Sequence, residues 1–146
     1  MTEVDTRTVE QTIRIAARPE TVWAYWTDPE LLREWWGAAG PFDATPGGEY
    51  RVSMSHHDPA PVMGGQFLEL VPHERIVFSF GWEPAEGLPE IAVGSSRVEV
   101  TLVADGGDTV LTLRHSGIPA RYGDDHAAGW AQELAGLAQA VANLKG

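Results

Sequence analysis

Three histidines and one tyrosine are the side chains of this sequence whose types and spacing point to proton chemistry. Tyr50 and His56 share one side of an alternating run, because every second residue of a strand points the same way. His115 ends another alternating run, and His126 lies one helical turn before Trp130. Imidazole titrates near neutral pH and can serve as a general acid or base. We therefore name His56, His115 and Tyr50 as candidate catalytic residues; the competing interpretation of each histidine is a hydrogen-bonded group at the end of a strand or helix.

Metal binding and nucleophilic catalysis have weaker support. His56, His57 and Asp58 are adjacent, but neighbouring residues of a strand face opposite sides, and no H-x-H or H-x-x-x-H pattern accompanies them. Ser95 and Ser96 follow a glycine without forming a G-x-S-x-G elbow. The chain has no cysteine that would supply a thiolate or a disulfide. We therefore expect no metal site.

Two adjacent tryptophans, Trp35 and Trp36, raise a different possibility. The chain has 6 tryptophans, and this side chain occurs in cores, pocket walls and interfaces. Neighbouring residues of a helix point about 100° apart, so the pair is not expected to share one groove. We expect Trp36, which is nearer to the glycines that follow, to face a ligand cavity and Trp35 to pack elsewhere. In the competing interpretation both rings fill solid core.

Charge and composition exclude several classes of partner. Ten basic and 21 acidic residues give a net charge of −11, which repels nucleic-acid phosphates and anionic membranes. The chain has neither an apolar signal segment nor an apolar run long enough to span a membrane, so we expect a cytoplasmic protein. A length of 146 residues predicts a single domain over 1–146. The oligomeric state is left open as monomer or homodimer.

The elements that must position these residues begin with a strand and two short helices. The segment 8–15, T-V-E-Q-T-I-R-I, alternates between apolar and polar residues and predicts a half-buried strand. Pro19 suits the first turn of a helix. The pattern T-D-P-E at 27–30 resembles a capping box and predicts a second helix, which carries L-L-R-E-W-W and ends at Gly37 and Gly40.

The rest of the chain predicts five more strands and one long helix. We expect strands over 49–56, 66–71, 75–82, 96–104 and 109–115. The strand at 66–71 is apolar on both sides, which leaves its orientation open. The helix over 123–145 carries one apolar stripe at steps of four and three, formed by Trp130, Leu134, Leu137, Val141 and Leu144. The predicted fold is α+β: a curved antiparallel six-stranded sheet wrapped around a long C-terminal helix, with two short helices after the first strand.

Five segments carry a resemblance to a known family. They are P-E-T-V-W (19–23), T-D-P-E-L-L-R-E-W-W-G (27–37), G-G-x-Y-R-V-x-M (47–54), P-H-E-R-I-V-F-S-F (72–80) and H-A-A-G-W (126–130). In this order they resemble the helix-grip superfamily, which includes START lipid-transfer domains, the birch-pollen-allergen fold and aromatic polyketide cyclases. Within it, the chain is most similar to the branch named after the activator of heat-shock-protein ATPase.

The resemblance implies a pocket for an apolar or aromatic molecule between the sheet and the long helix, and it implies no cofactor. We therefore predict that the chain binds a small hydrophobic or aromatic ligand. Two alternatives stay open: a cofactor-free cyclase, dehydratase or hydrolase acting on a hydrophobic substrate, and a chaperone-associated interaction domain. The residues predicted to line the pocket are Trp36, Tyr50, Met54, His56, Phe78, Phe80, Trp82, Val100, Leu113, His115, His126, Trp130 and Leu134.

Overall fold

Seven strands form one sheet in the computed structural model, which describes residues 5–54 and 60–145 apart from the side chains at 38, 39, 144 and 145. The strands are β1 (Thr6–Ile15), β2 (Ala38–Phe42), β3 (Glu49–Ser53), β4 (Val62–Val71), β5 (Arg75–Trp82), β6 (Ser96–Asp105) and β7 (Asp108–Pro119). The helices are α1 (Pro19–Thr27), α2 (Pro29–Leu32), the short 3-10 helix η1 (Ala120–Tyr122) and α3 (Gly123–Lys145). Within the described part of the chain, no helix is long and apolar enough to cross a membrane.

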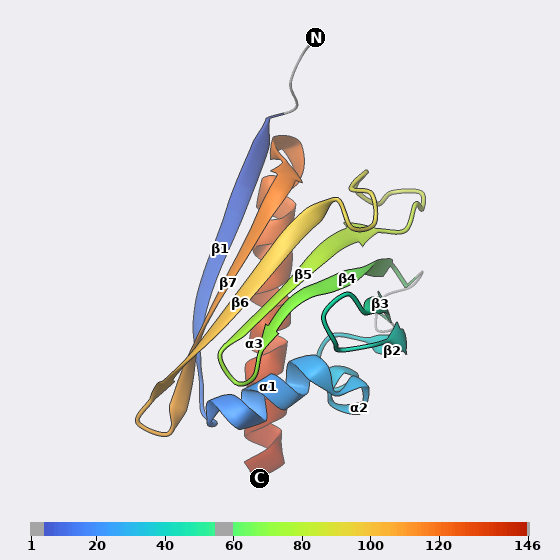
Figure 1. Ribbon diagram of the computed structural model, residues 1–146. Coiled ribbons are helices and arrows are strands. Elements are labelled where there is room, and N and C mark those ends of the chain that lie inside the picture. Colours follow the sequence, from blue (N-terminus) through green and yellow to red (C-terminus); the bar gives the residue numbers. More distant parts are fainter. Residues whose placement is uncertain (1–4, 55–59, 146) are drawn as a thin grey trace.

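The sheet places the first strand beside the last one. Its order is β1-β7-β6-β5-β4-β3-β2, and every neighbouring pair is antiparallel. In Figure 1 the sheet curves past α3, while α1 and α2 lie at the end of the sheet toward which α3 runs. The α+β class, the antiparallel sheet, the two short helices and the long C-terminal helix are as predicted. The helix begins at Gly123, and its stripe is buried at Trp130, Leu134, Leu137 and Val141; the side chain of Leu144 lies outside those described.

The prediction of six strands is wrong, because residues 38–42 form a seventh. This strand, β2, pairs with β3 and is the edge of the sheet. Its sequence, A-A-G-P-F, lacks apolar alternation and contains glycine and proline, which are both depleted in strands. Proline is tolerated here because an edge strand leaves one row of its backbone groups unpaired. The fourth strand also begins earlier than predicted, at Val62 instead of Gln66, because the M-G-G segment pairs with β3.

The alternation of β6 and β7 predicts their buried faces correctly. The inward residues of β6 and β7 are all buried: Val98, Val100, Leu102, Thr109, Leu111, Leu113 and His115. In β4, whose orientation the sequence leaves open, Phe67 is 3% exposed and Leu68 is 47% exposed. The Phe67 ring packs against those of Phe42, Tyr50 and Phe78. Phe67 therefore belongs to the core and Leu68 to the outer face.

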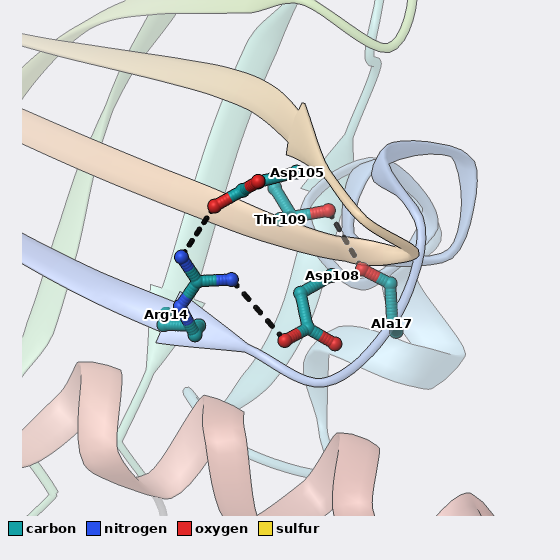
Figure 2. A network of polar contacts seen from close by, with 5 residues as sticks. All are labelled: Arg14, Ala17, Asp105, Asp108 and Thr109. Carbon is teal, nitrogen blue, oxygen red and sulfur yellow. Dashed lines mark hydrogen bonds and ion pairs between the residues drawn. The ribbon is translucent and has the colours of Figure 1, made fainter.

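Polar contacts tie the hairpin between β6 and β7 to the chain around β1 (Figure 2). Arg14 on β1 forms ion pairs with Asp105 and Asp108, which flank the hairpin turn, the second at 3.3 Å between Nη1 and Oδ2. Thr109 donates its buried hydroxyl to the carbonyl of Ala17 at 2.7 Å. Ala17 lies between β1 and α1, so this bond fixes where the chain leaves the sheet. The ion pairs of Arg14 are exposed to solvent and contribute little to stability, because water screens them.

The second helix is shorter than predicted and does not include the two tryptophans. Asp28 caps it by accepting a hydrogen bond from the Glu30 backbone N–H at 3.0 Å, and the helix ends at Leu32. Residues 33–36 form turns, so the angular spacing of a helix does not apply to them. The rings of Trp35 and Trp36 are stacked, with centroids 5.5 Å apart and planes 20° apart. The two rings therefore lie side by side, an arrangement that the spacing of a helix does not predict.

The two faces of β4 give a matched test of this packing. We expect Phe67→Ala to lower the free energy of unfolding by about 3–5 kcal/mol, because it removes a ring from the core. Leu68→Ala, one residue along, removes an exposed side chain and is expected to cost less than about 1 kcal/mol. Urea unfolding curves of the two variants measure both values. Equal losses would mean that the orientation of β4 described here is incorrect.

Candidate functional site

A pocket of about 150 Å³ opens between α3 and the sheet. Its walls come from the turn after α2, from β4 and β5, from the segment that follows β3, from the loop before β6 and from α3. The lining residues are Trp36, Met54, Met63, Phe80, Trp82, Pro89, Asp125, His126, Gly129, Trp130 and Glu133. Most of these side chains are apolar, and four of them are aromatic rings of tryptophan or phenylalanine. The pocket therefore offers flat apolar walls together with a few polar groups on the helix.

Several of the predicted residues border this pocket. They are Trp36, Met54, Phe80, Trp82, His126 and Trp130. Of the two adjacent tryptophans, only Trp36 does so. Trp35 instead donates its indole N–H to the carbonyl of Tyr25 at 2.8 Å, inside the core. Both residues are buried, with 6% and 4% of their surfaces exposed, so both belong to the core and Trp36 also borders the pocket.

Other predicted residues lie deeper in the core and do not border the pocket. Tyr50 and Phe78 border a separate void of about 10 Å³, and Tyr50 donates its hydroxyl to the carbonyl of Ser79 at 2.7 Å. Three more are fully covered core residues: Val100, Leu113 and Leu134. They face inward as predicted and belong to the buried core cluster. His56 lies outside the described residues.

Five lining residues were missed: Met63, Pro89, Asp125, Gly129 and Glu133. The first two fall in segments that the sequence suggests are loops. The other three are four residues apart along α3, which places them on one face of the helix. That spacing is a signal in the sequence that could have found them. A Cβ atom added to Gly129 would meet nothing within 4 Å, so the absence of a side chain there leaves space at the pocket.

Hydrogen bonds hold both ring nitrogens of His115 and define its tautomer. The Trp130 indole donates to Nδ1 at 2.9 Å, and because an indole nitrogen can only donate, Nδ1 carries no proton. The proton is therefore on Nε2, which lies 2.8 Å from Oγ of Ser96. That hydroxyl donates in turn to the carbonyl of Phe80 at 2.7 Å. Each donor in this chain meets one acceptor, and His115 is neutral.

His126 is held in the same manner at the edge of the pocket. The Trp82 indole donates to Nε2 at 3.1 Å, which leaves Nε2 without a proton. Nδ1 carries the proton and lies 2.9 Å from the carbonyl of Tyr122, one helical turn earlier. Both histidines are thus neutral, and in each a tryptophan N–H occupies the lone pair that a general base would use.

These contacts favour a structural role for the two histidines. Burial, together with the nearby His126, lowers the pKa of His115 to about 3, and burial lowers the pKa of His126. The Ser96–His115 contact does not activate a nucleophile, because the imidazole nitrogen that faces the hydroxyl already carries a proton. Burial raises the pKa of Tyr50 well above its ordinary value. None of these groups is poised to exchange a proton near neutral pH.

The pocket does not supply a metal site from the part of the chain that is described. No group of three or more histidine, aspartate or glutamate side chains is arranged there to hold an ion. Asp125, His126 and Glu133 all border the pocket, but both nitrogens of the histidine are already hydrogen-bonded within the protein. The segment His56-His57-Asp58 lies outside the described residues.

Comparisons with known proteins agree with this architecture. The family model described as Activator of Hsp90 ATPase homolog 1-like protein matches residues 16–142. The crystal structure of protein CV1439 from Chromobacterium violaceum is 28% identical, over 92% of this chain and 96% of that one, with a TM-score of 0.78. Protein MLL2253 from Mesorhizobium loti is 26% identical, over 94% and 98% of the two chains, with a TM-score of 0.77.

A further solved relative is an Aha1 protein from Colwellia psychrerythraea, whose solution structure is that of a dimer. It is 20% identical, over 92% of this chain and 96% of that one, with a TM-score of 0.69. At this level of identity the likeness concerns the fold alone. No curated protein matches the chain in sequence.

The neutral state of His115 predicts how stability depends on pH. The imidazole of the unfolded chain takes up a proton near pH 6.5, whereas the native imidazole does so only at about pH 3. Between these values the unfolded state binds one more proton, so the free energy of unfolding falls by up to about 1.4 kcal/mol per pH unit as the pH decreases. We expect the His115→Gln variant to lack this contribution.

Urea unfolding of the two proteins, at several pH values from about 7.5 down to about 4.5, measures the difference. Carboxyl groups titrate in both proteins and cancel in the comparison. The excess stability of the wild-type protein over the variant should shrink as the pH decreases. Parallel pH curves would show that His115 takes up a proton as readily in the native as in the unfolded chain.

Proposed function

This chain belongs to the Activator of Hsp90 ATPase homolog 1-like family, and from this premise we propose that it binds a small hydrophobic or aromatic molecule in the pocket between the sheet and α3. The observation that carries the proposal is the composition of the pocket wall, in which Trp36, Phe80, Trp82 and Trp130 surround the space. Ligand pockets are typically concave and apolar, with a few convergent polar groups. In this proposal residues 1–146 act as one binding domain.

The volume of the pocket limits the apolar part of the ligand to about the size of one aromatic ring. A volume of about 150 Å³ equals that of an engineered protein cavity that accepts benzene. A fused multi-ring molecule needs more space than this, unless part of it protrudes through the mouth. We therefore expect a ligand whose apolar part is a single aromatic ring or a short branched chain.

Catalysis is less well supported than binding. A proton-moving enzyme needs an acid or base that can exchange protons near neutral pH, and the contacts of His115, His126 and Tyr50 hold each of them in one protonation state. His56 stays a candidate from the sequence alone. No contact among the described residues singles out a surface for a chaperone partner.

Filling the pocket at Gly129 tests the proposal without weakening the fold. A leucine there would project into space that is empty, and replacing a helical glycine is expected to stabilise α3 by about 0.5–1 kcal/mol. We expect wild-type protein to bind benzyl alcohol and indole, detected as a change in tryptophan fluorescence. Gly129→Leu should weaken both at least about tenfold, since the added side chain occupies the volume of the ligand.

Ala128→Leu is the matched control. It adds the same side chain to the preceding position of α3, at an exposed residue that does not border the pocket. This variant should bind both probes as the wild-type protein does. If neither probe binds to wild-type protein, or if the two leucine variants behave alike, the pocket is not the binding site proposed here.

A further inference from the structure

The indole N–H of Trp26 is buried without a hydrogen-bond partner in the described part of the chain. Trp26 lies in the last turn of α1 and is 2% exposed, and its N–H bonds to no described residue. By contrast, the N–H groups of Trp35, Trp82 and Trp130 all donate to acceptors within the protein. A donor withdrawn from water without an acceptor lowers stability, so buried polar groups are almost always hydrogen-bonded. The Trp26 N–H therefore calls for an acceptor that the described side chains do not supply.

Trp26 borders the small void that lies apart from the pocket. The void has a volume of about 10 Å³ and is walled by the aromatic rings of Trp26, Trp36, Phe42, Tyr50, Phe67 and Phe78. This volume is about that of one water-sized sphere, the smallest space that holds a water molecule. An organic ligand does not fit into it. The size of the void therefore matches one kind of occupant, a single water.

The polar groups around the void complement each other. Among the side chains that line it, the indole N–H of Trp26 and the hydroxyl of Tyr50 are the polar groups. Tyr50 donates its proton to the carbonyl of Ser79 at 2.7 Å, which leaves the lone pairs of its oxygen to accept hydrogen bonds. A donor and an acceptor thus border the same space. Cavities lined by apolar groups alone stay dry, whereas a buried water requires at least two polar partners.

The ring of Trp35 offers the Trp26 N–H a weaker alternative. The two ring centroids lie 4.7 Å apart with planes at 65°, an edge-to-face arrangement. An N–H directed at a ring face makes a contact of second order compared with a hydrogen bond to oxygen. An oxygen atom in the void satisfies the N–H better, and it also uses the free lone pairs of Tyr50.

We infer that the void is a binding site for one water molecule, which accepts a hydrogen bond from Nε1 of Trp26 and donates one to the hydroxyl oxygen of Tyr50. The water links α1 to β3. Trp36 borders both this void and the larger pocket, and its ring packs on that of Trp26 with centroids 5.9 Å apart. The water therefore supports a wall of the pocket from behind, whatever the pocket binds.

A high-resolution crystal structure of the wild-type protein tests the position of this water. We expect a density peak in the void within about 2.7–3.2 Å of both Nε1 of Trp26 and Oη of Tyr50. A void without such a peak, or a peak that reaches neither atom, would overturn the inference.

Nuclear Overhauser measurements on ¹⁵N-labelled protein test the same contact in solution. The Trp26 indole proton should show a cross-peak to water whose sign is opposite in the laboratory and rotating frames, which distinguishes a bound water from proton exchange. The Trp35 indole proton is the internal control, because it is equally enclosed but donates to the carbonyl of Tyr25. It should show no such cross-peak. An upfield-shifted Trp26 proton without a water cross-peak would show instead that the ring face of Trp35 is its acceptor.

Tyr50→Phe keeps the ring and removes the oxygen that accepts from the water. The water cross-peak of Trp26 should then be lost, since one of the two partners is gone. Tyr25→Phe is the matched control, because it removes the hydroxyl of a tyrosine that does not border the void, and the cross-peak should persist. A cross-peak unchanged in Tyr50→Phe would exclude the bridge. Tyr50→Phe also breaks the bond to Ser79, so thermal unfolding verifies that it is folded; if it is not, the two wild-type measurements decide.

Discussion

The hydrogen bond from the Trp130 indole to Nδ1 of His115 joins α3 to the sheet, and the rest of the architecture depends on this contact. It begins a chain of bonds that passes from α3 through β7 and β6 to a carbonyl of β5. Polar groups buried between a helix and a sheet need partners, since an unpaired one costs about 1–3 kcal/mol. Here each donor and each acceptor in this series of hydrogen bonds has a partner. The bonds therefore set the position of α3 with a directionality that apolar packing alone does not provide.

The pocket follows from how the anchored helix meets the sheet. At Trp130 the space between them is filled by aromatic rings, including those of Trp36 and Phe80. The preceding residue, Gly129, has no side chain to extend this packing, and a Cβ atom there would meet nothing. Glycine is a poor helix former, and Gly129 is an exposed residue of α3 whose missing side chain leaves open space beside the pocket. The same helix thus closes the core at Trp130 and leaves space one residue earlier, at Gly129.

The histidines illustrate how the environment of a side chain decides its role. Their residue type and inward position make them candidates for acid–base chemistry in the sequence, and two of them do lie together between the helix and the sheet. Each accepts an indole N–H and directs its own proton to an oxygen of the protein. A lone pair committed in this way stabilises the fold and is not available to a substrate. One scaffold can serve binding or catalysis, and in this chain the described contacts favour binding.

Sequence periodicity by itself determined the larger part of the fold. The alternation of β6 and β7 and the apolar stripe of α3 identified which residues face inward, because these patterns follow from the local geometry of strand and helix. Local patterns did not predict the irregular segments: β2 has no alternation of apolar and polar residues, and α2 ends before Trp35 and Trp36. The orientation of β4 could be assigned only from its pairing with the neighbouring strand. Only the tertiary structure decided which inward residues border the pocket. Met54, Phe80 and Trp130 border it, while Val100 and Leu113 face the same way and are packed solid. That difference is set by the spacing between elements distant in the chain, which no local pattern of residues encodes.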